Sequence, residues 1–158
     1  MKYCIKQKVF SFKDKFYIYD EQGNEMLYVE GEFFSFGKKF HVYDLNGREI
    51  AFINQKVFSF LPKYYISKNG SQCAEVTKQF SLFNQEYTVR GPEWRVTGDF
   101  FNHEYFIYGM DHTVASITKE WFTWGDTYSV DVASGEDEIT AISVAIIIDA
   151  ILDQQNNN

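Results

Sequence analysis

Short segments in which apolar and polar residues alternate run through most of the chain, and this alternation predicts half-buried β-strands. Successive side chains of a strand point to opposite faces, so alternate residues share one face. The apolar pairs predicted to face a common core are Phe16/Ile18, Phe40/Val42, Tyr64/Ile66, Tyr87/Val89, Tyr105/Ile107 and Tyr128/Val130. The wetter face is predicted to carry Lys15/Tyr17, Lys39/His41 and Lys63/Tyr65.

A Phe-Ser-Phe motif recurs along the chain and divides it into repeats. It occupies residues 9–12, 33–36 and 57–60, and weaker versions follow at 80–83, 100–101 and 121–124. We interpret each motif as a first strand and the alternating segment after it as a second strand. Turn signals such as Asn46-Gly47 and Asn69-Gly70 then join one repeat to the next, with positive φ expected at both central residues.

Six two-strand repeats in hairpin order predict an antiparallel meander of about twelve strands. Closure of the meander into a barrel would remove the exposed edges that invite aggregation. A propeller is the competing repeat architecture, but two strands form only half a blade. The predicted fold class is therefore mainly β, a closed antiparallel barrel.

The C-terminal segment, residues 138–152 (EITAISVAIIIDAIL), is apolar on nearly every face. Residues 139–152 would rise about 21 Å as a helix, short of the roughly 30 Å hydrocarbon core of a bilayer. A barrel of more than about eight strands leaves a lumen that something must fill. We therefore expect a central hydrophobic α-helix inside the barrel rather than a membrane anchor. Ser134 is predicted as its N-cap, with Asp137 at the third helical position.

Length and composition indicate one domain. A chain of 158 residues can bury a core without metals or disulfides, and only two cysteines are present, Cys4 and Cys73. We expect a single domain over residues 1–153 and a disordered tail over 154–158 (QQNNN). The N-terminal residues lack the apolar run of a signal peptide, so the expected location is cytoplasmic, with peripheral membrane association as an option.

The net charge of −7 argues against nucleic-acid binding, which needs clustered Lys and Arg. The charge is uneven along the chain. Residues 1–78 hold 12 Lys/Arg against 9 Asp/Glu, whereas residues 79–158 hold 3 against 13. A polarised molecule follows if these two parts of the chain occupy different sides of the fold.

The repeats and the terminal helix together resemble the LURP-one-related family. The resemblance rests on residues 6–12 (KQKVFSF), 16–31 (FYIYDEQGNEMLYVEG), 33–51 (FFSFGKKFHVYDLNGREIA) and 136–153 (EDEITAISVAIIIDAILD). It implies the tubby C-terminal-like barrel, twelve strands around a central hydrophobic helix, shared in outline with phospholipid scramblases. Tubby domains dock on phosphoinositide headgroups, and scramblases associate with membranes and calcium. Neither property carries over residue by residue, because no calcium-loop motif or cysteine cluster is present.

Catalytic and metal-binding motifs give no positive signal. The sequence has no G-x-S-x-G, no P-loop and no glycine-rich dinucleotide loop. His41, His103 and His112 do not have the spacing of a metal triad, although His103 and His112 could pair across a hairpin. We therefore expect no enzyme activity, no cofactor and no metal.

The turns within the repeats are predicted to share one rim of the barrel, and half of that rim is basic. The candidate ligand-binding residues on it are Lys13, Lys15, Lys38, Lys39 and Lys63. They could bind an anionic lipid headgroup or an acidic protein partner. Solvated turn lysines that maintain solubility are the alternative explanation.

Tyrosines on the wetter face form a second candidate surface. Tyr17, Tyr19, Tyr43 and Tyr65 could contact a partner, or could simply pair across neighbouring strands. The sequence thus predicts a non-enzymatic binding or scaffold domain. It acts at a membrane surface or on a protein partner and has no transmembrane segment. The alternative is a carrier or sensor of a hydrophobic ligand held in the barrel.

Overall fold

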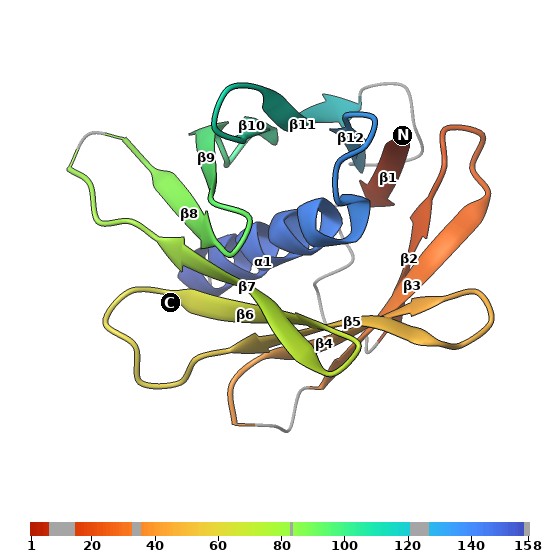
Figure 1. Cartoon of the computed structure of the whole chain (residues 1–158), viewed down its shortest axis with the longest axis horizontal. Helices are drawn as coiled ribbons and strands as arrows, with labels where there is room; N and C mark the ends of the chain where they lie inside the picture. The colour runs from red at the N-terminus through yellow and green to blue at the C-terminus, as the bar shows by residue number, and fades with distance from the viewer. Residues whose placement is uncertain (7–14, 33–35, 83, 121–126, 157–158) are drawn as a thin grey trace.

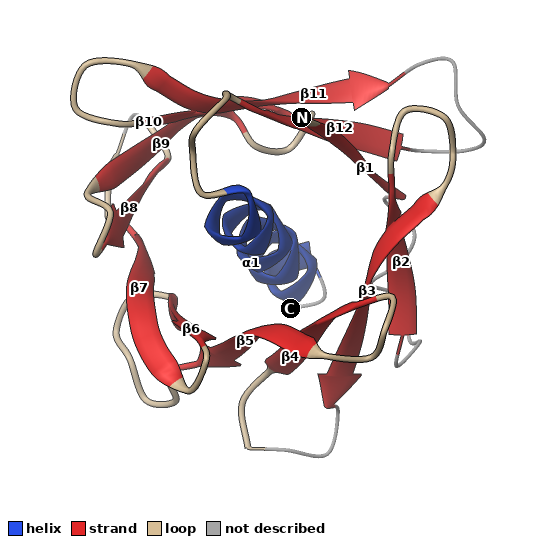
Figure 2. Ribbon diagram, turned by 45° about the vertical axis from the view of Figure 1, so that its right-hand side comes forward, coloured by secondary structure: helices blue, strands red, loops and turns tan. Residues whose placement is uncertain are grey.

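The computed structural model describes the chain except for residues 7–14, 33–35, 83, 121–126 and 157–158. The described residues form twelve antiparallel strands that close into a barrel around a helix, α1 (Glu138–Asn156), as Figures 1 and 2 show. The strands are β1 (Lys2–Lys6), β2 (Lys15–Tyr19), β3 (Glu25–Glu32), β4 (Lys39–Asp44), β5 (Glu49–Gln55), β6 (Lys63–Lys68), β7 (Ser71–Lys78), β8 (Glu86–Arg90), β9 (Trp94–Asp99), β10 (Glu104–Tyr108), β11 (Thr113–Glu120) and β12 (Thr127–Val132). The predicted fold class is confirmed.

Each strand pairs with its neighbours in the chain, and β1 closes the ring by pairing with β12. The closing register runs from Lys2 opposite Asp131 to Lys6 opposite Thr127. Because every strand has two partners, the sheet has no free edge. The barrel has two ends. We call the end with the β2–β3, β4–β5, β6–β7, β8–β9 and β10–β11 turns and the start of α1 the turn end, and the opposite end the loop end.

The interior is formed by the residues that the alternation assigned to it. All six apolar pairs of the even-numbered strands are buried, and none of these side chains is more than 7% exposed. The odd-numbered strands add pairs of the same kind, such as Leu27/Val29 in β3 and Ala51/Ile53 in β5. The predicted outward residues, among them Lys15, Tyr17 and Lys39, are partly or fully exposed.

Most of the tight turns lie at the turn end, and they are closed by side chains as well as by backbone. The carboxylate of Asp20 accepts hydrogen bonds from the backbone N–H groups of Gln22 and Asn24, and Asp44 does the same for Asn46 and Arg48. Asp side chains stabilise turns in this way. The expected two-residue turn with positive φ at both positions occurs at Asn69 (52°) and Gly70 (77°). At Asn46-Gly47 the expectation is wrong, because only Gly47 (81°) has a positive φ.

Where the structure describes the Phe-Ser-Phe motifs, they are not strands, and the prediction for those residues is wrong. Residues 36 and 57–60 lie in the loops after β3 and β5, and residues 80–82 follow β7. The strand that precedes each loop, such as β5 with Ala51 and Ile53, already supplies the inward apolar face. Residues 9–12, 33–35 and 121–124 lie outside the described part of the chain. The number of strands is still twelve, because each repeat has a strand before its motif in place of the one predicted at the motif.

Helix α1 occupies the barrel interior, and its residues from Thr140 to Ile151 are buried. Its N-cap is Asp137 rather than Ser134. The Asp137 carboxylate accepts hydrogen bonds from the backbone N–H of Thr140 (3.1 Å) and from the Thr140 hydroxyl (2.7 Å). The helix continues through residues 154–156, which we expected to be part of a disordered tail. Within the described residues, no helix has the length and apolarity that crossing a membrane requires.

Candidate functional site

The basic rim that the sequence predicted lies at the loop end, where the even-numbered strands begin. Lys15, Lys39 and Lys63 are the first residues of β2, β4 and β6, and Lys38 directly precedes β4. Lys13 lies outside the described residues. The rim lysines therefore share one end of the barrel, but each of the four described ones is engaged within the fold.

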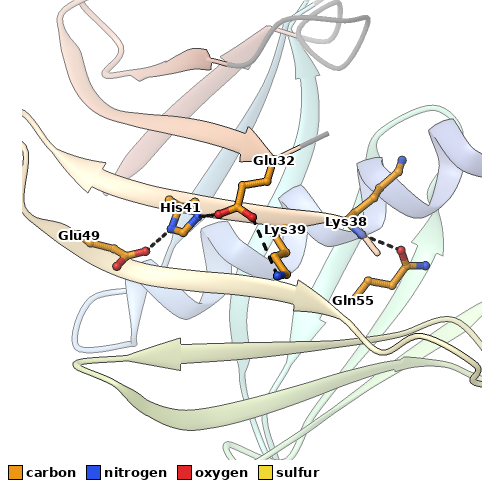
Figure 3. A network of polar contacts seen from close by, with 6 residues as sticks. All are labelled: Glu32, Lys38, Lys39, His41, Glu49 and Gln55. Atoms are coloured by element: carbon orange, nitrogen blue, oxygen red, sulfur yellow. Dashed lines mark hydrogen bonds and ion pairs between the residues drawn. The ribbon is translucent and has the colours of Figure 1, made fainter. Parts of the chain in front are cut away.

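Lys38 connects the start of β4 to the last turns of α1. Its Nζ donates a hydrogen bond to the backbone carbonyl of Ala150 (3.2 Å) and lies 3.7 Å from the Asp153 carboxylate. Its backbone N–H donates to Gln55 Oε1 at 3.1 Å, as Figure 3 shows. Burial lowers the pKa of Lys38, which the charge of Asp153 opposes only in part. A cation at a helix C-terminus satisfies free carbonyls, so Lys38 has a structural role.

The other rim lysines contact acidic or aromatic neighbours. Lys63 lies 2.9 Å from Glu75 on the adjacent strand β7, and Lys39 lies 4.0 Å from Glu32 on β3. Lys15 lies over the ring of Tyr28, 4.0 Å from its centroid. Such partly exposed contacts contribute little stability, so the lysines could exchange them for a ligand.

His41 lies on the outer face of β4 between two carboxylates (Figure 3). Its Nε2 is 2.7 Å from Glu32 and its Nδ1 is 2.5 Å from Glu49. Burial lowers the pKa of His41, but the hydrogen bonds to both glutamates outweigh it and raise the pKa above its usual value. In turn, the bond from His41 lowers the pKa of Glu32.

This arrangement predicts a pH-dependent contribution to stability. A histidine whose pKa is raised by folding stabilises the protein fully below its unfolded pKa of about 6.5 and loses this contribution as the pH rises through the raised value. In thermal unfolding, wild type is expected to exceed His41→Gln in Tm at about pH 5.5, with the difference shrinking by about pH 8.5. Hydrogen bonds to Asp111 and Glu136 also raise the pKa of His112. Because His112 is present in both proteins, its contribution cancels in the Tm difference. A Tm difference that stays constant with pH would contradict this assignment.

The sequence prediction missed two lysines and a group of apolar side chains at the loop end. Lys56 is exposed in the β5–β6 loop, and Lys78 is half-buried at the end of β7. Within the described part of the chain, neither ammonium group forms an ion pair. The apolar side chains exposed at this end are Phe36, Phe58, Phe60, Phe80, Leu82 and Phe101. Most of these apolar residues belong to the Phe-Ser-Phe motifs, which the sequence prediction had assigned to strands because their residues alternate.

A pocket of about 410 Å³ opens at the loop end, between the β5–β6 loop and the last turn of α1. Phe58, Phe60 and Leu61 line it from the loop, and Ile151 and Gln154 line it from the helix. Lys56 is the basic residue at its wall. The pocket therefore combines apolar side chains with one ammonium group.

The predicted option of a metal site between His103 and His112 is wrong, because the two residues lie at opposite ends of the barrel. His112, in the β10–β11 turn, lies 2.8 Å from Asp111 and 2.5 Å from Glu136. His103, in the β9–β10 loop, is buried. Among the described residues, no three His, Cys, Asp or Glu side chains gather in a group that could hold a metal ion.

His103 is part of a buried polar cluster that joins the barrel wall to α1. Its Nε2 lies 2.8 Å from Asp149, and its ring stacks on Tyr128 at a centroid distance of 4.3 Å. The Tyr128 hydroxyl donates a hydrogen bond to the second Asp149 oxygen. Burial, followed by the charge of Asp149, raises the pKa of Tyr128 well above its usual value, so the hydroxyl keeps its proton. The one acidic residue in the buried part of α1 is thus paired on both oxygens.

The tyrosines of the outer face pair across neighbouring strands. Tyr28 stacks on Tyr43 with ring centroids 4.9 Å apart, and Tyr17 lies 6.1 Å from Tyr28 in a tilted arrangement. Cross-strand aromatic pairs of this kind stabilise a sheet. This geometry supports the structural explanation for Tyr17 and Tyr43. Tyr19 lies 6.5 Å from Tyr17 on the same strand, and the Lys6 ammonium lies 5.3 Å from the centroid of the Tyr19 ring.

A twelve-strand antiparallel barrel around a buried C-terminal helix places the protein in the class of tubby C-terminal-like barrels. Residues 1–149 match the model of the LURP-one-related family, and the chain belongs to this family. It is 37% identical over 148 residues to the uncharacterised protein YxjI of Bacillus subtilis (strain 168), an alignment covering 94% of this chain and 91% of YxjI. No enzyme family is indicated by these matches.

The fold is also similar to that of a protein from Arabidopsis thaliana whose X-ray structure is known. The two structures superpose with a TM-score of 0.69 over 95% of this chain and 90% of the plant protein, at 17% sequence identity. At this identity the likeness concerns the fold alone. The family resemblance stated from the sequence is confirmed, and the function has to be argued from the molecule itself.

Proposed function

We propose that the protein is a non-enzymatic binding domain that docks on an anionic lipid surface through the loop end of its barrel. The observation that carries this proposal is the excess of lysine over acidic residues on the sector from β4 to β8. Lys38, Lys39 and Lys63 there are matched by Asp153, Glu32 and Glu75, and Glu86 at the start of β8 is paired with Arg95. Lys56 and Lys78 add two further positive charges, which form no ion pair among the described residues. Each lysine near an anionic leaflet contributes about 1 kcal/mol of attraction.

The opposite end of the barrel is acidic. Its turns and the start of α1 hold Asp20, Glu21, Glu93, Asp111, Glu136 and Asp137, against Arg48 in the turns and Lys2, Lys68 and Arg90 at the adjoining strand ends. An overall charge of −7 would otherwise oppose binding to an anionic membrane. With charge distributed in this way, the electrostatic field favours an orientation with the loop end toward the lipid and the turn end in water.

The alternative from the sequence, a carrier that holds a hydrophobic ligand in the barrel, receives no support from the interior. Helix α1 fills that space with residues that are almost all fully buried from Thr140 to Ile151. A ligand inside the barrel would have to displace the helix. A surface function at the loop end requires no such rearrangement.

Co-sedimentation with vesicles of phosphatidylcholine alone or with phosphatidylserine tests the proposal. Wild type is expected to bind only the anionic vesicles. Lys56→Glu should weaken this binding at least about fivefold and the double variant Lys56→Glu/Lys78→Glu at least about 25-fold. Arg48→Glu, which changes the net charge equally at the turn end, serves as the matched control and should stay within about twofold.

Two results would contradict the proposal. One is the absence of binding by wild type to anionic vesicles. The other is equal weakening by Lys56→Glu and Arg48→Glu, which would show that only net charge matters. Binding to soluble polyglutamate without binding to vesicles would instead indicate an acidic protein partner.

A further inference from the structure

The exposed apolar side chains of the described residues are concentrated at one end of the barrel. Ten large apolar side chains of the described residues are exposed, and six of them lie on loop-end connections. These six are Phe36 (72% exposed), Phe58 (91%), Phe60 (96%), Phe80 (74%), Leu82 (80%) and Phe101 (69%). Exposed apolar groups scattered singly are ordinary, but a concentration on one surface marks a site of interaction.

The loops that carry these side chains follow one another around the ring. They connect β3 to β4, β5 to β6, β7 to β8 and β9 to β10, which are consecutive in the barrel (Figure 2). Two of the loops touch through their aromatic rings, because the centroids of Phe36 and Phe58 are 5.6 Å apart. The six residues therefore form a crown of loop tips, which we call the apolar crown, rather than isolated exposures.

The backbone at Phe58 shows that its exposure is built into the loop. Phe58 has a φ of 59°, in the left-handed region that a bulky residue rarely adopts. Such a conformation is strained and normally persists where the surroundings or the function require it. Here the side chain gains no burial in return, since it is 91% exposed. The contact that the ring does make is with Phe36, another exposed side chain.

We infer that the apolar crown inserts into the interfacial region of the bilayer, an inference that rests on the docking function proposed above. A lysine stands directly beside the apolar tips, since Lys56 is two residues before Phe58. Apolar and aromatic side chains next to lysine are the composition of segments that lie in a membrane interface, with the apolar part about 5–10 Å below the headgroups. The lysine heads then remain at the headgroup level.

The charge at the loop end is complementary to an anionic lipid surface. Insertion removes each phenyl group from water, and this transfer of apolar surface favours binding. Lys56 lies on the same loop as the two most exposed phenylalanines, Phe58 and Phe60, and its charge is complementary to an anionic headgroup. Insertion thus adds an apolar component to binding that salt does not screen, whereas lysine attraction alone falls steeply with ionic strength.

The experiment combines a variant, a salt titration and a depth probe. Phe58→Ser/Phe60→Ser is compared with Leu45→Ser/Met110→Ser, which removes two exposed apolar side chains at the turn end. Binding to phosphatidylcholine vesicles containing phosphatidylserine is measured at about 0.1 M and 0.5 M NaCl. For depth, an environment-sensitive fluorophore is attached at Phe60→Cys or Met110→Cys in a Cys4→Ser/Cys73→Ser background, and brominated lipids serve as quenchers.

If the crown inserts, Phe58→Ser/Phe60→Ser weakens vesicle binding at least tenfold and the turn-end control less than twofold. Wild type keeps part of its binding at the higher salt, while the crown variant loses all of it. The fluorophore at position 60 shifts to the blue and is quenched by brominated lipid, and the one at position 110 is not.

The opposite results separate this inference from the proposed function. If wild type binds anionic vesicles but the crown variant binds equally well and the fluorophore at position 60 is unchanged, insertion is wrong and electrostatic docking stands. If wild type binds no vesicle of either composition, both fail. In every case the crown variant must have the same Tm as wild type, which shows that it is folded. Because both replaced side chains are exposed, we expect no change in Tm.

Discussion

Replacing Ile147 with aspartate is expected to unfold the whole barrel. Ile147 lies in the middle of α1 and is fully buried, as are its neighbours Ile146 and Ile148. A carboxylate without a partner in such surroundings costs several kcal/mol even after it takes up a proton. Proteins of this size are stable by only about 5–15 kcal/mol. Because α1 fills the barrel, the strands lose their packing surface together with the helix.

Far-UV and near-UV circular dichroism, with thermal unfolding, would measure the effect. Gln155→Asp introduces the same carboxylate at an exposed position near the end of α1 and is expected to leave the Tm unchanged within a few degrees. Ile146→Asp should behave as Ile147→Asp does. A folded, cooperatively melting barrel in either core variant would show that the strands do not need the helix.

Removing the Asp149 carboxylate is expected to destabilise the protein by about 3 kcal/mol. In Asp149→Ala, the buried His103 ring and the Tyr128 hydroxyl lose the oxygens to which they are bonded. A buried polar group left without its partner costs about 1–3 kcal/mol, and two groups are affected here. Asp153→Ala, one turn further along α1, is the matched control. Its carboxylate is partly exposed, so it should cost less than about 1 kcal/mol.

A double-mutant cycle separates the lost partner from the lost volume. Tyr128→Phe removes the hydroxyl that would otherwise be left unpaired, so the combined variant should cost about 1 kcal/mol less than the sum of the two single variants. Urea unfolding gives the required free energies. Strict additivity would mean that the contact between Tyr128 and Asp149 contributes no stability.

Much of the fold could be predicted because the spacing of apolar residues along the chain indicates which side chains are buried. The period of two identified the inward pairs of every even-numbered strand, and the uniformly apolar C-terminal segment identified α1. The Phe-Ser-Phe motifs were assigned wrongly because an alternating aromatic triplet has the same period whether it faces a core or lies in a loop. Only the pairing shows that β5, with Ala51 and Ile53, already fills the place given to residues 57–60.

The candidate site was predictable in position but not in its contacts. Meander order was sufficient to place Lys15, Lys38, Lys39 and Lys63 at one end, since alternate strands of an antiparallel barrel begin together. Their partners depend on register and on the path of the helix. Glu75 meets Lys63 across a strand pair, and the Ala150 carbonyl meets Lys38 from 112 residues away. No local pattern contains either contact, nor the exposure of Phe58 and Phe60.

The pairing of β1 with β12 has a consequence for how the repeats can evolve. In open solenoids, units can be gained or lost because each contacts only its neighbours. Here the strands form a closed barrel, and its interior must fit the diameter of one helix, roughly 10–12 Å with its side chains. A gene that duplicated or deleted one repeat would leave the helix loose or exclude it. The repeats of this chain are therefore free to diverge in their loops but not to change in number.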